Sequence, residues 1–71
     1  MRYTVEITSV PDREFWVAEI WDGSEMVAEI SRNGGGEYSL QIYYSKEERC
    51  RNFDLVEFQA SLSEAREKLG I

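Results

Sequence analysis

The sequence predicts an α+β fold: a four-stranded antiparallel β-meander, with the strand order 1-2-3-4, carries one C-terminal α-helix on one face. Apolar and polar residues alternate along four stretches between residues 3 and 44, as in strands with one buried face, and turn-forming residues separate these stretches. After residue 52 the apolar residues recur at spacings of three and four, as on one face of a helix. We therefore expect a single ββββα domain covering residues 1–71.

The central hairpin is predicted between Phe15 and Ser31, because Val-Ala-Glu-Ile occurs twice there, on either side of residues 22–24. A three-residue loop at 22–24 pairs Ala18 with Ala28 and brings the apolar sets of both strands to one face, whereas a two-residue loop mismatches the faces. The face expected to lie under the helix carries Trp16, Ala18, Ile20, Met26, Ala28 and Ile30.

One further strand is expected on each side of this hairpin. Residues 3–7 alternate, and Pro11 favours a turn whose four-residue loop pairs Val5 with Ala18. Residues 33–36, Asn-Gly-Gly-Gly, favour another turn, with a glycine bulge, that pairs Ala28 with Leu40. All three connections agree on the order 1-2-3-4.

The helix is predicted from Phe53 to Gly70. Asp54 can cap its first turn, Glu57 can complete a capping box, and Phe53 can pack on Phe58 as a hydrophobic staple. Gly70 suits a left-handed C-terminal cap. The buried face of the helix is expected to carry Leu55, Phe58, Leu62, Ala65 and Leu69.

Charge narrows the range of partners. The chain has 14 acidic and 8 basic residues and a formal net charge of −6. Direct nucleic-acid binding and docking on an anionic membrane are disfavoured, because both depend on Lys and Arg. A basic protein surface is the better electrostatic match. The alternative is that this acidity only keeps a small domain soluble.

Two features of the sequence bear on the cellular compartment: its cysteine content and the length of its apolar runs. The single cysteine, Cys50, excludes an internal disulfide and favours a reducing compartment. No apolar run approaches the ~18 residues of a membrane span, and the first residues lead into a strand rather than a signal-peptide core. We expect a soluble, cytoplasmic protein.

Residues that carry enzymatic chemistry are scarce. The absence of histidine excludes the commonest general base, the Ser-His and Cys-His pairs and the usual imidazole metal ligand. Residues 34–36 lack the Lys-Ser/Thr continuation of a phosphate loop, and Cys50 has no second cysteine to work with. We therefore expect no enzymatic activity, no cofactor and no metal site.

The sheet face away from the helix is the candidate binding surface. One helix cannot cover both faces, so aromatic and aliphatic side chains interleaved with carboxylates are expected to stay partly exposed there, as in interfaces. The alternative is that strand twist and residues 45–52 cover them. Trp21 is the expected anchor, whereas Trp16 is expected under the helix. The candidate partner-binding residues are Phe15, Val17, Glu19, Trp21, Val27, Glu29 and Tyr43.

The first quarter of the chain resembles a known family. Residues 2–7, Arg-Tyr-Thr-Val-Glu-Ile, followed by residues 16–20, Trp-Val-Ala-Glu-Ile, look like the first two strands of HicB-type antitoxins. That resemblance implies a helix after the third strand, whereas this sequence continues with a fourth strand. Its function is therefore not carried over.

Three classes of function follow. The leading hypothesis is a non-enzymatic protein-binding module, a small acidic protein of the antitoxin, immunity or phage-encoded inhibitor type, that binds a basic protein through the outer face. One alternative is a homodimer in which two outer faces or two edge strands bury each other. The other is a nucleic-acid mimic built from ordered carboxylates.

Overall fold

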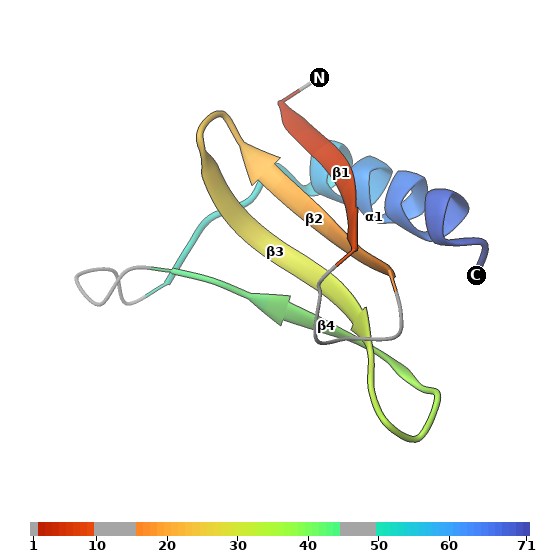
Figure 1. Cartoon of the computed structure of the whole chain (residues 1–71). Helices are drawn as coiled ribbons and strands as arrows, with labels where there is room; N and C mark the ends of the chain where they lie inside the picture. Colours follow the sequence, from red (N-terminus) through yellow and green to blue (C-terminus); the bar gives the residue numbers. More distant parts are fainter. Residues whose placement is uncertain (1, 10–15, 45–49) are drawn as a thin grey trace.

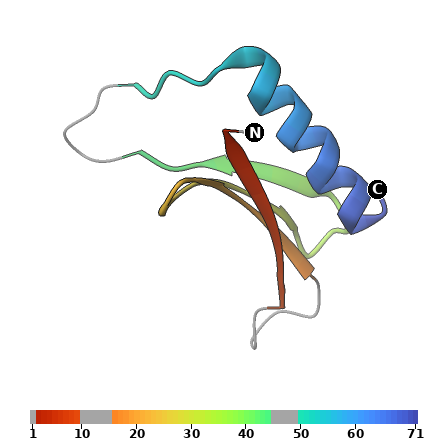
Figure 2. The same ribbon diagram turned by 90° about the horizontal axis from the view of Figure 1, so that it is seen from above.

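The computed structural model describes residues 2–9, 16–44 and 50–71. Strands β1 (Tyr3–Ser9), β2 (Trp16–Asp22), β3 (Glu25–Arg32) and β4 (Tyr38–Ile42) form one antiparallel sheet in the order β1-β2-β3-β4. Helix α1 (Leu55–Leu69) lies across one face of this sheet (Figure 1, Figure 2). The predicted fold class is confirmed.

The strand registers differ from the predicted ones by two residues at every strand pair, except beside the β2–β3 turn, where Trp21 pairs with Met26 and the shift is one residue. Because side chains alternate with a period of two, such a shift keeps most residues on their predicted face but changes all of their cross-strand neighbours. The observed pairs include Val5 with Ile20, Ala18 with Ile30 and Ala28 with Ile42, where the sequence predicted Val5 with Ala18, Ala18 with Ala28 and Ala28 with Leu40.

The lengths of two connections explain the shift: the β1–β2 connection is longer than predicted, and the β2–β3 turn is shorter. Ser9 faces Trp16, so residues 10–15 join β1 to β2 in place of the expected four-residue loop. Asp22 faces Glu25, so residues 23–24 join β2 to β3 in place of the expected three-residue loop. Gly23 adopts a φ of 63°, a left-handed conformation that glycine reaches without steric strain.

A β-bulge in β3 reconciles this shorter turn with the buried face. The pairing passes from Trp21–Met26 directly to Ile20–Ala28, which leaves Val27 as an extra residue in β3. Met26 therefore shares a face with Trp21, so its predicted place under the helix is wrong. Val27, predicted on the outer face, instead joins the hydrophobic core and is fully buried.

The core lies between the sheet and α1, on the predicted face. Ala18 and Ala28 of the sheet and Ser61 and Ala65 of the helix are all 0% exposed. Small side chains on both layers let the helix backbone approach the sheet closely. The buried apolar cluster comprises Tyr3, Val5, Ala18, Ile20, Val27, Ala28, Ile30 and Ala65, with Ile7, Phe53, Phe58, Leu62 and Leu69 packed against it.

The predicted ends of the helix are confirmed except in one bond. The Asp54 carboxylate accepts a hydrogen bond from the Glu57 amide at 2.9 Å, and the Phe53 and Phe58 rings pack with centroids 4.2 Å apart. Gly70 caps the C-terminus with a φ of 77°. The Asp54 amide, however, donates to the Tyr3 hydroxyl at 3.0 Å, so this tyrosine takes the place that the capping box assigned to Glu57.

Two residues predicted to be buried are exposed. Trp16 is 59% exposed because it pairs with Ser9 at one end of the sheet, where it lines a recess of about 210 Å³ with Ile7, Lys68 and Leu69 at the end of the helix. Leu55 is 71% exposed because Phe53, just before the helix, occupies the place beside Tyr3 and Phe58.

Replacing Ala18 by leucine should destabilise the fold by about 1–3 kcal/mol, because the close approach of α1 leaves no room for a larger side chain. Thr4→Leu, at an exposed position of the same sheet, is the control for the general effect of adding leucine. Chemical denaturation of both variants measures the difference. Equal stability of the two would contradict the observed packing.

Replacing Tyr3 by phenylalanine should cost about 1 kcal/mol of unfolding free energy, because the Asp54 amide loses its acceptor while the ring packing is kept. Tyr44→Phe, which removes an exposed hydroxyl, should change the stability by much less. Thermal melts of the two variants make the comparison. A neutral Tyr3→Phe would show that water replaces this hydrogen bond without loss.

Candidate functional site

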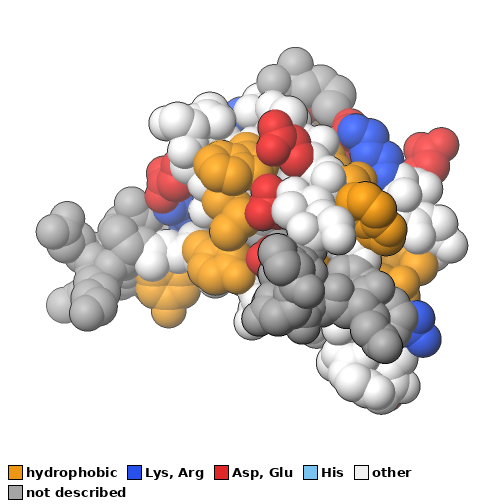
Figure 3. All heavy atoms as spheres, viewed as in Figure 1, with side chains coloured by type: hydrophobic (Ala, Val, Ile, Leu, Met, Phe, Trp, Pro, Cys, Tyr) orange, Lys and Arg blue, Asp and Glu red, His pale blue; other side chains and the backbone are white. Residues whose placement is uncertain are grey.

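The sheet face opposite α1 is called the outer face. It is formed by the alternate side chains of β1 to β4 that point away from the helix. Figure 3 looks onto it and shows acidic side chains lying beside a group of hydrophobic ones. A surface of this kind combines charge complementarity at its edge with apolar area at its centre, which is the usual composition of a protein interface.

Three glutamates form a row across the outer face. Glu6 of β1 faces Glu19 of β2, and Glu19 faces Glu29 of β3; Gln41 of β4 continues the same row. Directly opposed residues of neighbouring strands lie about 4.5–5.5 Å apart at their Cα atoms, and like charges at that separation are unfavourable. The three glutamates are called the acidic row below, and within this row the opposed charges of Glu6 and Glu19 repel one another.

The central glutamate of this row is held by two hydrogen bonds. The Thr8 hydroxyl and the Trp21 indole N–H each donate to Oε1 of Glu19, both at 3.3 Å. The carboxylate is thereby fixed between β1 and the indole ring. A charge whose position is set in the free protein loses little conformational entropy when it meets a partner.

A recess lies at one end of the acidic row. It has a volume of about 320 Å³ and is lined by Thr4, Glu6, Trp21, Gly23 and Ser24. Its lining includes both an aromatic residue, Trp21, and a carboxylate-bearing residue, Glu6. A Lys or Arg side chain suits this combination, since its stem packs on apolar surface, its charge is attracted by an aromatic face, and its head pairs with a carboxylate.

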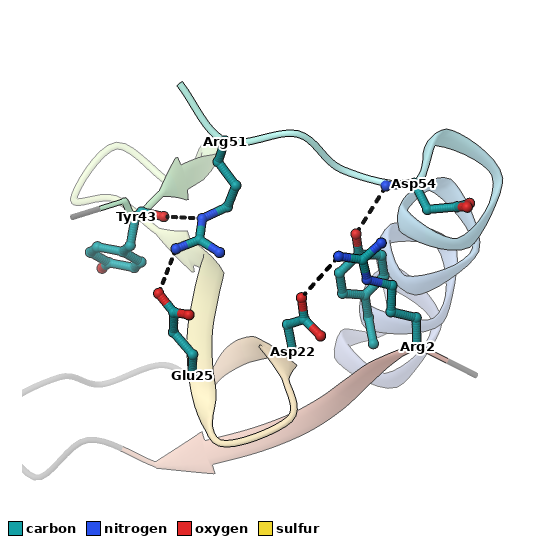
Figure 4. Close-up of polar contacts among 7 residues, drawn as sticks. Arg2, Asp22, Glu25, Tyr43, Arg51 and Asp54 are labelled. Atoms are coloured by element: carbon teal, nitrogen blue, oxygen red, sulfur yellow. Dashed lines mark hydrogen bonds and ion pairs between the residues drawn. The ribbon is translucent and has the colours of Figure 1, made fainter. Parts of the chain in front are cut away.

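Ion pairs fix the β2–β3 turn beside the recess (Figure 4). Arg2 contacts Asp22 at 3.4 Å, and Arg51 bonds both the Glu25 carboxylate and, at 3.1 Å, the Tyr43 carbonyl. These contacts tie the turn to the N-terminal strand and to the segment before α1. The wall of the recess formed by the turn is therefore held in place from two sides.

The structure brings together some of the predicted site residues and removes others. Glu19 and Trp21 lie side by side and half-buried, and Tyr43 is exposed, with its hydroxyl bonded to Gln41. Glu29 belongs to the acidic row but is only 8% exposed. The expected exposure of Val17 and Val27 is wrong.

Val17, which faces Thr8 of β1, is 1% exposed although alternation places it on the outer face. Val27 is buried by the bulge described above. Phe15 lies outside the described residues.

Glu6 and Thr8 also belong to this site, although neither was among the predicted site residues. Alternation alone places both on the outer face, but their contact with Glu19 depends on the register, which the pattern left ambiguous by two residues.

Replacing Glu19 by glutamine should stabilise the fold by about 0.2–1 kcal/mol, because the amide oxygen keeps the bonds from Thr8 and Trp21 while the like charge opposite Glu6 is removed. Glu37→Gln, at an exposed position outside the row, is the matched control. The gain should shrink as salt is added, since salt screens the repulsion. Urea denaturation at two ionic strengths measures both effects, and a less stable Glu19→Gln would contradict the repulsion.

No second kind of site is seen in the part of the chain that the structure describes. There, no group of three or more histidine, cysteine, aspartate or glutamate side chains could hold a metal ion. In the same residues, no helix is both long enough and apolar enough to cross a membrane. Comparison of the chain with protein-family models, with curated proteins and with solved structures gives no match.

Proposed function

We propose that this chain is a non-enzymatic protein-binding module of the small acidic inhibitor, antitoxin or immunity type, and that it binds a basic protein surface through the outer face. The observation that carries this proposal is the recess at Trp21, which opens directly beside the acidic row. A carboxylate row alone would suit any cation. An indole wall next to it favours a cation attached to an apolar stem, which is the chemistry of Lys and Arg side chains.

The arrangement provides both an anchor and a guide for the partner. Trp21 is a half-buried aromatic residue of the kind that dominates binding energy in protein interfaces. The acidic row and the net charge of −6 attract a basic surface over a longer range and so raise the rate of encounter. Affinity is thus expected to depend on Trp21, and the rate of association on the carboxylates.

The opposition of like charges also supports a binding role. Glu6 and Glu19 carry like charges at opposed positions of β1 and β2, and a cationic partner relieves this repulsion when it binds. A sheet selected for stability alone would place charges of opposite sign at these positions. The cost to folding is therefore recovered in the complex.

Replacing Trp21 by alanine should weaken partner binding by about 2 kcal/mol or more, roughly 30-fold, as loss of a central aromatic anchor does. Trp16→Ala is the matched control, because it removes the same side chain from an exposed position away from the recess. Tagged wild type and both variants are used to capture partners from extracts of cells that express the chain. Mass spectrometry identifies the captured proteins, and calorimetry measures their affinities.

The proposal expects a basic protein that wild type and Trp16→Ala retain and Trp21→Ala loses. Glu6→Lys should slow association with that protein, and added salt should reduce the difference between Glu6→Lys and wild type. A partner with an acidic binding surface, or one that all three chains bind equally, would rule the outer face out as the binding site.

A further inference from the structure

Strand β4 has an open edge. In the described sheet it has a neighbour on one side only, β3, and its five residues, Tyr-Ser-Leu-Gln-Ile, include no charged residue and no proline. Helix α1 packs mainly on β1 and β2, so the three apolar side chains of β4 on the helix side remain exposed, Leu40 by 44%. An open, uncharged and apolar strand edge is the usual template for pairing with another strand.

The other edge of the sheet is protected in a way that β4 is not. Near β1, the Lys68 ammonium donates to the carbonyl of Val5 at 3.4 Å, and α1 contacts this strand along its length. A charged side chain placed at an edge and a covering helix are two common devices against edge-to-edge association, and here α1 supplies both. The sheet is therefore closed at β1 and open at β4.

The backbone of β4 is oriented for pairing at this edge. The Tyr43 amide donates to the Val27 carbonyl of β3 at 2.9 Å, which fixes the residues of this segment that face β3. Since successive amides of a strand point to opposite sides, those of Ile42, Leu40 and Tyr38 point away from β3. The residues with outward-pointing amides are thus the same ones that carry the exposed apolar side chains.

We propose that β4 pairs antiparallel with β4 of a second copy of this chain, about a two-fold axis at Leu40. In that register Leu40 faces Leu40 of the partner subunit, and Tyr38 faces Ile42 of the partner subunit, with each pair exchanging two backbone hydrogen bonds. On the opposite face Ser39 meets Gln41 of the partner subunit. Apolar residues meet apolar ones on the helix side, and polar residues meet polar ones on the outer face, so the strand is complementary to itself.

A second copy fits this edge better than a charged partner. The strand offers a peptide ligand no carboxylate or basic group to recognise, whereas an identical strand satisfies every one of its positions. The two copies each carry a net charge of −6 and repel one another at long range. Dimerisation should therefore strengthen with added salt, whereas binding of a basic protein at the outer face should weaken.

This inference is independent of the proposed function. Edge pairing joins two sheets side by side and leaves both outer faces open on the same side of the continuous sheet. The failure of one proposal thus leaves the other standing.

Sedimentation equilibrium of the wild-type chain over a range of concentrations and salt tests the dimer. We expect reversible dimers at micromolar concentrations and tighter association at high salt. Leu40→Lys, which places two like charges at the two-fold axis, should raise the dissociation constant at least about tenfold. Gln59→Lys, at an exposed helix position, adds the same charge away from β4 and should leave dimerisation unchanged.

Two further measurements keep the test independent of that one variant. Leu40→Pro removes an outward amide that β3 does not use, so it should abolish dimers while the chain stays folded by circular dichroism. Amide hydrogen exchange of the wild type should show Leu40 and Ile42 becoming protected as concentration rises. A wild-type chain that is monomeric at its highest soluble concentration, or dimers that persist in Leu40→Lys or form without protection of these amides, would overturn the proposal.

Discussion

The buried ring of Tyr3 holds the helix on the sheet. Its ring contacts Phe53 at 6.0 Å and Phe58 at 5.6 Å between centroids, and its hydroxyl accepts a hydrogen bond from the Asp54 amide at 3.0 Å. One residue of the first strand thus fixes both the segment that enters α1 and the first turns of the helix. In a chain this short, where one core provides little surplus stability, such a contact between distant segments decides where the second layer lies.

The position of the helix determines which surfaces stay free. Because α1 is fixed over β1 and extends over β2, it closes the β1 edge and leaves β4 uncovered. It does not cover the outer face, where Glu19 and Trp21 stay half-buried and Tyr43 exposed. The two surfaces on which binding is proposed, the outer face and the β4 edge, are therefore both consequences of one small helix that covers half of one side of the sheet.

Local patterns predicted the fold class, the helix caps and the faces of most residues, because each depends on neighbours within one element. The registers were wrong by two residues, since alternation is unchanged by such a shift and the turn lengths were inferred from the pattern itself. The bulge at Val27 and the exposure of Trp16 could not be predicted either. The bulge depends on how a tight turn is accommodated in β3, and the exposure of Trp16 depends on where α1 ends on the sheet.

The register also decides the chemistry of the candidate site. In the predicted pairing Glu6 faced Val17, so that its carboxylate lay away from Glu19; the observed pairing places Glu6, Glu19 and Glu29 in one row. The bulge exchanges Val27 for Met26 on the outer face but leaves its glutamates in place, and only the observed pairing brings Glu6 opposite Glu19, beside Trp21. The binding proposed at this face thus depends on strand alignment, which is set by turn lengths and by the bulge. Selection on a binding surface of this kind would therefore act on the turn lengths that set strand alignment as well as on the side chains that contact the partner.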